Sequence, residues 1–313
     1  MKLDPKTTFF VFPGQGSQIV GMGRELATRY PIAQQTFEEA DAILGYKLSK
    51  LMWEGPVDGL NDTINTQPAL FAHSIAVFRV FSHIYPIFRP AGVAGHSLGE
   101  LSALTASGAL TFEAGLRLVR KRGELMKRAG ERNPGSMAAI LNLDIPTLEK
   151  VCADASSDLE PVQVANDNCP GQIVISGSKA AVERAMAGAK TAGAKRAIPL
   201  AVSIAAHSNL MASIQDEWND AVSASKINTP NLRIIGNVNA DVLHSAMEVS
   251  SDIQAQMQSR VRWTETIQLL TKEGINTFVE GGPGNVLLGL IRRINPSISG
   301  YVLGNPADFD ALE

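Results

Sequence analysis

The sequence contains little cysteine and no long apolar segment. Its 313 residues include only two cysteines, Cys152 and Cys169, which is too few for a disulfide framework or a zinc site and suits a reducing compartment. No stretch is long enough to span a membrane, and the N-terminus lacks the apolar core and cleavage site of a signal peptide. We therefore expect a cytoplasmic protein with no membrane partner, although an organellar protein without its transit peptide would look the same.

The sequence also lacks an excess of charge of either sign. The formal net charge is −3 and the isoelectric point is about 6.0, whereas nucleic-acid binding requires a strongly basic face. We therefore expect no nucleic-acid partner. There are no internal repeats, and the hydrophobic content of 45% is ordinary for a globular protein with one large domain or two smaller ones.

The first third of the chain alternates apolar strands with helices. Residues 7–12 (TTFFVF) are β-branched and aromatic and stop at Pro13-Gly14, which predicts a buried strand ending in a glycine turn. The small apolar residues 91–95 predict a second buried strand. Helices are expected at 23–30, 68–84, 98–107 and 112–129. The second of these has Pro68 near its start, where a missing N–H costs least. This order of elements indicates a parallel α/β sheet.

A different order of elements begins near residue 133. Strands are expected at 136–143, 162–166, 172–176 and 194–200, and helices at 146–155 and 179–192. This β-α-β-β-α-β order is typical of the ferredoxin-like unit. We therefore predict a small ferredoxin-like domain at 133–201, inserted into a larger α/β domain made of 1–132 and 202–313. In the last part of the chain, strands are expected at 232–236 and 277–280, and helices from about 251, from 264 and at 285–294.

The stretch GHSLG (95–99) has the pattern of a nucleophile elbow. It follows an expected strand and precedes an expected helix, which is the context that this motif requires. A sharp turn from strand to helix crowds the backbone, so glycines are needed beside the serine. The Ser97 hydroxyl would then stand at a helix N-terminus, where the N–H of Leu98 is free to bind an oxyanion. A small-residue helix start packed against a strand is the alternative explanation.

A serine hydroxyl needs a base in order to act as a nucleophile. The five histidines of the chain are His73, His83, His96, His207 and His244. Four of them adjoin the serine, share one expected helix or lie in a polar loop. His207 follows a small apolar stretch and opens a helical pattern, so it is the best candidate by elimination. No acidic residue stands out as the third member of a triad.

These motifs occur together in a known family. Over nearly its whole length, the chain resembles the malonyl-CoA:acyl-carrier-protein transacylases, which are acyltransferases of bacterial fatty acid synthesis. The matching blocks are FVFPGQGSQIVGMG (10–23), TQPAL (66–70), GHSLGELSAL (95–104), LVRKRGELM (118–126), GSMAAI (135–140), NCPGQIVISG (168–177), GAKRAIPLAVSIAAHS (193–208) and EGGPGNVLLGLIRRI (280–294). The resemblance implies an α/β-hydrolase-like large domain with a parallel sheet core and an inserted ferredoxin-like small domain, in agreement with the order of elements.

The resemblance also implies catalytic roles. Ser97 would become acylated, and His207 would act as its base and later as an acid. In the family, a main-chain carbonyl orients the histidine, and the matching position here is Gln256 in QMQSRVRW. This would explain the missing acid. The surrounding block departs from the family, because Ser259-Arg260 stands where an asparagine-proline pair is frequent.

Three further residues match binding positions of the family. Gln15 and Leu98 would supply the two backbone N–H groups of an oxyanion hole. Arg122 would bind the free carboxylate of a malonyl group, since a guanidinium forms two charge-assisted bonds with a carboxylate. By its pattern alone, Arg122 belongs to a run of cations on a helix, and such runs usually face water.

The implied function is transfer of a malonyl group from malonyl-CoA to the phosphopantetheine thiol of an acyl carrier protein, in a ping-pong reaction through an O-malonyl serine. No metal and no cofactor is expected, and we expect a monomer, although no residue pattern decides the oligomeric state. Carrier proteins are acidic, so a basic patch should receive them. The candidate cations are Lys179, Lys190, Lys195, Arg196, Arg292 and Arg293.

Other functions remain open at this point. A serine esterase or thioesterase would share the elbow, but it would need an acidic triad member and would have no use for Arg122. A free-standing acyltransferase of a polyketide synthase or of a malonate decarboxylase system would share the whole chemistry. The sequence favours malonyl over methylmalonyl as the acyl group. A non-catalytic carrier-protein-binding module is disfavoured, because the positions of the nucleophile, the base and the arginine are all occupied.

Overall fold

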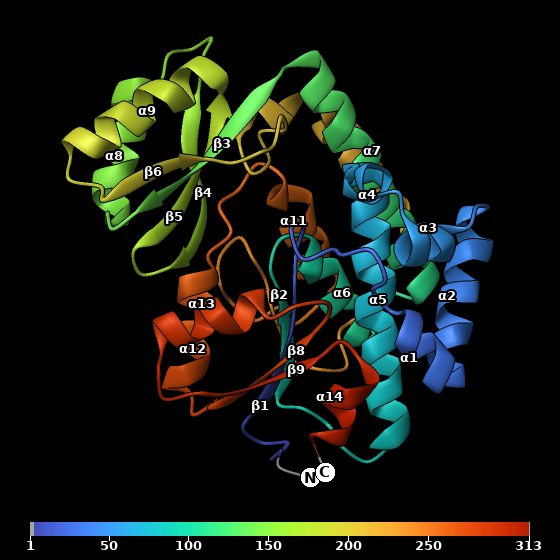
Figure 1. Cartoon of the computed structure of the whole chain (residues 1–313). Helices are drawn as coiled ribbons and strands as arrows, with labels where there is room; N and C mark the ends of the chain where they lie inside the picture. The colour runs from blue at the N-terminus through green and yellow to red at the C-terminus, as the bar shows by residue number, and fades with distance from the viewer. Residues whose placement is uncertain (1–2, 313) are drawn as a thin grey trace.

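The structure is a computed structural model that describes residues 3–312, and its strands form two separate sheets (Figure 1). The first sheet has five parallel strands in the order β7-β2-β1-β8-β9, and the second has four antiparallel strands in the order β4-β5-β3-β6. The strands are β1 (Thr8–Phe12), β2 (Gly92–Gly95), β3 (Gly135–Leu141), β4 (Val162–Cys169), β5 (Gln172–Ser178), β6 (Arg196–Pro199), β7 (Ile234–Ile235), β8 (Thr277–Gly281) and β9 (Ser299–Leu303).

The helices cover both faces of the parallel sheet and one face of the antiparallel sheet (Figure 1). They are α1 (Arg24–Arg29), α2 (Pro31–Leu44), α3 (Leu48–Glu54), α4 (Val57–Asn61), α5 (Thr63–Ile84), α6 (Leu98–Ala106), α7 (Phe112–Arg132), α8 (Ile145–Ala155), α9 (Lys179–Thr191), the 3-10 helix η1 (Asn209–Ile214), α10 (Gln215–Ala224), α11 (Ala246–Gln256), α12 (Trp263–Lys272), α13 (Val286–Ile294) and α14 (Pro306–Asp310).

The parallel sheet is the middle layer of three. Every residue of β1 is buried, and successive side chains alternate between the two faces, as the period of a strand requires. Phe10 and Phe12 pack among α5, α6 and α7, whereas Phe9 and Val11 pack against α12 and α13. An aromatic and β-branched segment without polar alternation is therefore what a strand buried on both faces needs.

The molecule has two bodies. The antiparallel sheet with α8 and α9 forms the smaller body, and the parallel sheet with the remaining helices forms the larger body. The chain order of the smaller body is β3-α8-β4-β5-α9-β6, and the spatial order of its strands is that of a ferredoxin-like unit. One face packs on α8 and α9 through residues such as Ile140 and Ile175, and the other face presents Met137, Ala165 and Val174 to the larger body. The predicted fold class is confirmed, while the boundaries at 133 and 201 stay a prediction.

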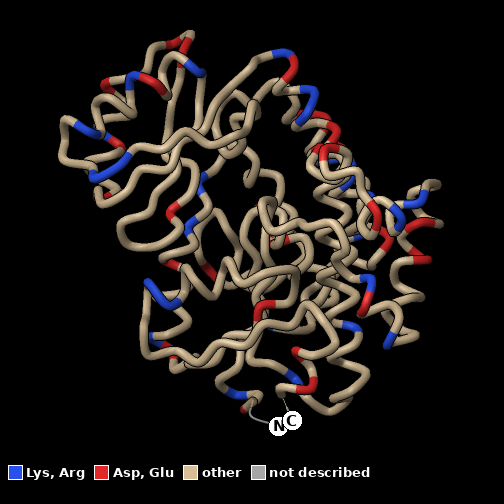
Figure 2. The backbone as a smooth tube through the Cα atoms, in the orientation of Figure 1, with Lys and Arg blue, Asp and Glu red and all other residues tan. Residues whose placement is uncertain are grey.

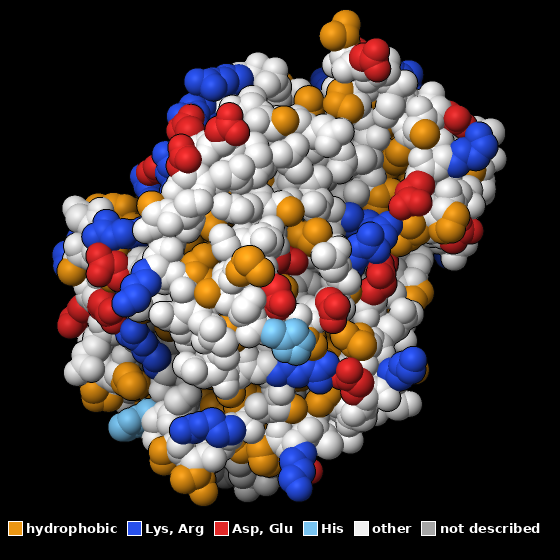
Figure 3. All heavy atoms as spheres, turned by 180° about the vertical axis from the view of Figure 1, so that it is seen from behind, with side chains coloured by type: hydrophobic (Ala, Val, Ile, Leu, Met, Phe, Trp, Pro, Cys, Tyr) orange, Lys and Arg blue, Asp and Glu red, His pale blue; other side chains and the backbone are white. Residues whose placement is uncertain are grey.

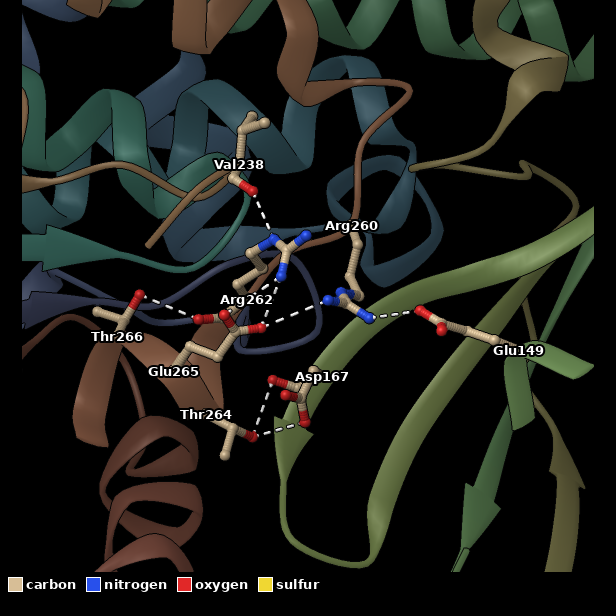
Figure 4. A network of polar contacts seen from close by, with 8 residues as sticks. All are labelled: Glu149, Asp167, Val238, Arg260, Arg262, Thr264, Glu265 and Thr266. Atoms are coloured by element: carbon tan, nitrogen blue, oxygen red, sulfur yellow. Dashed lines mark hydrogen bonds and ion pairs between the residues drawn. The ribbon is translucent and has the colours of Figure 1, made fainter. Parts of the chain in front are cut away.

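The two bodies are joined along strand β4 (Figure 4). The Asp167 N–H donates to the Val261 carbonyl, and the Val261 N–H donates to the Ala165 carbonyl, each at 2.9 Å. The Thr264 hydroxyl donates to Asp167 Oδ1 at 2.6 Å. Arg260 pairs with Glu149 of α8 at 2.9 Å. The segment after α11 is therefore fixed to the small sheet by backbone and side-chain bonds.

Several predicted helix boundaries were wrong. Helix α5 begins at Thr63, where Asp62 accepts the Ile64 N–H, so Pro68 lies inside the helix. A proline there leaves the carbonyl of residue 64 without its helical donor, and Arg120 Nη1 donates to that oxygen at 3.3 Å. Helix α11 begins at Ala246 rather than near 251, because Ser245 caps it by accepting the Glu248 N–H.

The elements that the sequence analysis did not predict include α2, α3, α4, α10, α14 and β9. Helix α2 begins at Pro31, and the single residue Tyr30 separates it from the end of α1 at Arg29. Strand β9 is an edge strand with a largely exposed or half-buried pattern, so it lacks the apolar run that identified the central strands.

The surface mixes charges and apolar groups. Figure 2 shows Lys and Arg interspersed with Asp and Glu along the outer helices, and Figure 3 shows hydrophobic side chains scattered among charged and polar ones on the rear face. Within residues 3–312, no helix is both long enough and apolar enough to span a membrane.

Candidate active site

Ser97 stands on a sharp turn between β2 and α6. Its φ of 53° lies in the left-handed region, where a residue with a Cβ is strained. The neighbouring glycines are required by packing. A Cβ on Gly95 would lie 1.9 Å from the Gly99 oxygen, and one on Gly99 would lie 2.0 Å from the Phe12 oxygen. The backbone approach that holds Ser97 in this conformation therefore excludes any other residue at 95 and 99.

His207 is the histidine that contacts Ser97. Its Nε2 lies 2.7 Å from Ser97 Oγ, and its Nδ1 lies 2.9 Å from the Gln256 carbonyl oxygen and 3.2 Å from the Ser259 carbonyl oxygen. Carbonyl oxygens only accept hydrogen bonds, so Nδ1 carries the proton and Nε2 is free to accept one from the serine. Burial, together with the positive charge of Arg122, lowers the pKa of His207 to about 3.

The loop that carries His207 is held by the small sheet. His207 has a φ of 58°, another left-handed conformation. Gln163 of β4 donates to the His207 carbonyl at 3.2 Å and to the Gln258 carbonyl at 3.1 Å. Strand β4 thus fixes both the histidine loop and the segment whose carbonyls orient the imidazole.

The other four histidines make no hydrogen bond to Ser97. His96 Nε2 pairs with Asn168 Oδ1 of β4 at 2.8 Å. His73 is buried in α5, where burial lowers its pKa to about 4. His83 and His244 are exposed. The choice of His207 by elimination therefore agrees with the geometry.

Arg122 points inward from α7 and lies beside the serine. Only 2% of it is exposed. Its Nη2 donates to Ser97 Oγ at 3.1 Å and to Gln256 Oε1 at 2.9 Å, and its Nη1 donates to Gln67 Oε1 at 3.0 Å. Burial lowers its pKa to about 10, so it remains charged at neutral pH. The other cations of this run form surface pairs with glutamates.

Gln256 connects three parts of the site. Its main-chain oxygen accepts from His207, and its side-chain oxygen accepts from Arg122. Its side-chain nitrogen donates to the Ser97 carbonyl at 2.9 Å and also to Glu100 Oε2. The departure of the sequence at 259–260 leaves this arrangement intact, because the Ser259 carbonyl also accepts from the imidazole.

Gln15 and Leu98 both line the cavity in front of Ser97. Among the hydrogen bonds of residues 3–312, neither of their backbone N–H groups has an acceptor. The Gln15 side chain is held by the Thr63 hydroxyl, which donates to Oε1 at 2.9 Å. Both positions can therefore present an N–H to an oxyanion in the cavity.

The sequence between residues 9 and 297 matches the family model described as "Acyl transferase domain". The chain belongs to the acyl transferase family. Its curated relatives include the malonyl CoA-acyl carrier protein transacylase of Haemophilus influenzae, which is 44% identical over 303 residues that cover 97% of each chain. The corresponding protein of Bacillus subtilis is 46% identical over 299 residues, or 95% of this chain and 93% of the relative.

Solved structures of the same kind superpose closely on this acyl transferase. An acyl carrier protein S-malonyltransferase from Vibrio cholerae gives a TM-score of 0.95 at 42% identity, covering 98% of this chain and 100% of the other. A malonyl-transacylase in complex with a type II polyketide synthase acyl-carrier protein gives 0.93 at 40% identity, covering 97% and 98%. The resemblance found in the sequence is confirmed.

The cavity of this acyl transferase lies between its two bodies and measures about 660 Å³. The larger body contributes Ser97 and Arg122, and the small sheet contributes Met137, Asn168 and Val174. A substrate that reaches Ser97 therefore passes between the two sheets, and both bodies can contact it.

Four residues of this site were not identified from the sequence: Gln67, Glu100, Gln163 and Asn237. Gln67 and Glu100 lie inside blocks that carried the family resemblance, but their partners come from distant helices. No pattern in the sequence pointed to Asn237, whose side chain accepts the Ser97 N–H at 2.7 Å and donates to the Gly95 carbonyl at 2.7 Å.

Proposed function

We propose that this acyl transferase moves the malonyl group of malonyl-CoA to the phosphopantetheine thiol of an acyl carrier protein, through an O-malonyl ester of Ser97. The names of its relatives support this choice of substrates. The single observation that carries it is the position of Arg122, a buried cation 3.1 Å from Ser97 Oγ. When the acyl group on Ser97 Oγ ends in a carboxylate, that carboxylate can reach the Arg122 guanidinium.

The first half-reaction transfers the malonyl group to the serine. His207 Nε2 takes the proton of Ser97 Oγ as the oxygen attacks the thioester carbonyl carbon. The N–H groups of Gln15 and Leu98 stabilise the oxyanion of the tetrahedral intermediate. The intermediate collapses, the carbon–sulfur bond breaks, and His207 returns its proton to the leaving CoA thiolate. The second half-reaction reverses these steps, with the carrier thiol as the attacking group.

Arg122 would select the substrate and would also change the basicity of His207. Its charge lowers the pKa of His207. A malonyl carboxylate that pairs with Arg122 offsets this charge, so the imidazole becomes a stronger base when the correct acyl group is bound. An acetyl group has no carboxylate, and it would leave the guanidinium without this partner in a buried site.

The carrier protein would dock at the open side of the cavity. Of the proposed cations, Arg293 is closest to the site by contact, because it donates to Gln172, which lines the cavity. Arg196 lies on the edge strand β6, which leads into the cavity-lining segment 200–204. Lys179 and Lys190 belong to α9, which covers the other face of the small sheet, so we propose Arg293 and Arg196 as the docking cations.

Three further expectations remain proposals. We propose that the reaction needs no metal or cofactor, since the serine, the histidine and backbone donors can supply each step. We propose a cytoplasmic location, which suits the two buried free cysteines. We also propose that the enzyme acts as a monomer.

A second pathway fits the same chemistry. One of the similar structures is a malonyl-transacylase bound to a carrier protein of a type II polyketide synthase. The carrier protein that receives malonyl from this chain could therefore belong to polyketide synthesis instead of fatty acid synthesis. A hydrolase is disfavoured, because a buried arginine at the serine has no role in hydrolysis of a neutral ester.

Intact mass spectrometry tests the proposed function directly. The enzyme is mixed with malonyl-CoA, methylmalonyl-CoA and acetyl-CoA in separate samples, and the mass added to the protein is measured before and after addition of a phosphopantetheinylated carrier protein. We expect a malonyl adduct that the carrier removes and that is missing in Ser97→Ala. An adduct that persists in Ser97→Ala, or one that water removes as fast as the carrier does, would contradict the proposal.

A further inference from the structure

Glu100 is a buried carboxyl group that the transfer reaction described above does not use. It lies in the first turn of α6, three residues after Ser97, and none of its surface is exposed. Its Oε1 accepts the Asn237 N–H at 2.9 Å, and its Oε2 accepts the Gln256 side-chain N–H. Glutamates at a helix start usually face water, so burial with two partners from distant parts of the chain requires another explanation.

Asp252 of α11 is a second buried carboxyl group beside Glu100. It is 7% exposed, and its Oδ1 accepts the Val238 N–H at 3.3 Å. Its Oδ2 is buried without a hydrogen-bond partner among the described residues. Burial raises the pKa of both carboxyl groups, and their mutual repulsion adds to the rise for Glu100.

Two neighbouring carboxyl groups held away from water repel each other when both are ionised, so the pair keeps one proton. Both oxygens of Glu100 already accept N–H bonds, a pattern that favours its ionised form. Asp252 Oδ2 is the oxygen without a partner, and a proton on it would supply the missing donor. The pair thus carries a single negative charge close to the buried cation of Arg122.

We propose that Glu100 and Asp252 form a proton-sharing pair that positions the catalytic groups through Gln256 and Asn237. Gln256 acts on His207 through its carbonyl and on Arg122 through its side-chain oxygen. Asn237 acts on the backbone on both sides of the strained turn, at Ser97 and at Gly95. Glu100 is therefore a positioning residue, since it touches none of the reacting atoms.

The proposed roles require two acceptor oxygens at position 100 and a hydrogen-bond donor at position 252. Glu100→Gln keeps the shape but has one acceptor oxygen for two N–H donors, so either Gln256 or Asn237 loses its partner. Asp252→Asn keeps an acceptor for Val238, and its amide N–H replaces the shared proton. Asp252→Leu has a similar volume and supplies no donor. The two variants at 252 thus differ in the donor that the proposal requires.

The test measures the rate at which a fluorophosphonate labels Ser97, because this reaction needs the serine and its base but no acyl-CoA. We expect Glu100→Gln and Asp252→Leu to label about tenfold more slowly than the wild type or slower still. We expect Asp252→Asn to recover most of that rate. The unfolding temperature of each variant is measured as well. Loss of a merely structural pair would lower the unfolding temperature and leave the labelling rate of the folded protein unchanged.

Two outcomes would overturn the proposal. One is that folded Glu100→Gln labels at the wild-type rate. The other is that Asp252→Asn and Asp252→Leu label at equal rates, and this comparison is decisive even if Glu100→Gln does not fold. The inference rests on the proposed role of Ser97 but not on its substrate. A wild-type enzyme that reacts with the fluorophosphonate and takes no malonyl group from malonyl-CoA would refute the proposed function and leave this test valid.

Discussion

His207 Nδ1 donates to the main-chain oxygen of Gln256 at 2.9 Å, so the imidazole is oriented by a neutral carbonyl and not by a carboxylate. A carboxylate would stabilise the protonated imidazole by its charge, and a carbonyl does so only by its dipole. Burial of the ring lowers the pKa of His207 most, and the cation of Arg122 lowers it further. The consequence is a base that stays unprotonated well below neutral pH.

The pH dependence of acylation should reflect this lowered pKa. His207 has a pKa of about 3 instead of the ordinary 6.5, so it remains able to accept a proton across the whole range in between. We expect kcat/KM for malonyl-CoA to stay flat from about pH 8 down to about pH 5. The measurement is the initial rate of transfer to a carrier protein at several pH values. A decline with a midpoint near the ordinary histidine value would contradict the expectation.

Buried histidines should also make stability depend on pH. His73 has a pKa of about 4 in the folded protein and 6.5 when unfolded, so the unfolded chain binds more protons between these values. The neutral, buried His73 therefore contributes stability above the unfolded pKa, and this contribution is lost as the pH falls towards 4. At about pH 5 the loss in unfolding free energy is about 2 kcal/mol. Urea unfolding of wild type and His73→Gln should show a weaker loss on acidification in the variant.

The comparison with His73→Gln must be made as a difference between the two proteins. Burial raises the pKa of Glu280 to about 7, and this group acts in the opposite direction, since it favours the folded state as the pH falls through that range. The Glu280 contribution is common to both proteins and cancels in the difference. Equal pH slopes for the two proteins would show that His73 is not buried in its neutral form.

Arg122 should control which acyl group is loaded. In Arg122→Ala, malonyl loading should fall by about 100-fold, because the carboxylate loses its charge-assisted bonds, and acetyl loading should rise relative to malonyl. Mass spectrometry of the acyl-enzyme after short incubations measures both rates. The control is Arg117→Ala, since Arg117 is an exposed cation of the same helix paired with Glu113. An equal loss for both acyl groups would argue against a carboxylate site.

The glycine before the serine turn should tolerate no side chain. Gly95→Ala places a Cβ 1.9 Å from the Gly99 oxygen, so the backbone must move, and we expect a loss of about 3 kcal/mol or more in unfolding free energy. Gly289→Ala is the control, because a Cβ there meets no atom within 4 Å and a helix interior gains about 0.5–1 kcal/mol. Urea unfolding measures both, and equal stabilities would contradict the close approach.

The docking surface can be tested by charge reversal. Arg293→Glu should raise the KM for an acidic carrier protein several-fold and leave the KM for malonyl-CoA unchanged, with the effect shrinking at high salt. Lys179→Glu makes the same charge change on α9, which covers the other face of the small sheet. Steady-state kinetics with the carrier as the varied substrate decides the matter, and equal effects of the two variants would remove Arg293 from the interface.

Much of the architecture was predictable because it depends on local patterns. The apolar segment from Thr8 to Phe12 could only be a strand buried on both faces, and the glycines of GHSLG mark a turn that leaves no room for a Cβ. Helix α5 shows where such patterns fail. Pro68 suggested a helix start, but the Arg120 side chain from another helix satisfies the carbonyl that the proline leaves free.

The same distinction applies to the candidate site, where some features follow from local sequence and others depend on tertiary packing. Ser97 and its glycine turn follow from the five consecutive residues GHSLG, because a strand, a turn and a helix are neighbours in the chain. The partner of the imidazole, the inward direction of Arg122 and the burial of Glu100 depend on how α6, α7 and α11 pack together. Hydrogen bonds and pKa values depend on distances between groups far apart in the sequence, so only the folded chain specifies them.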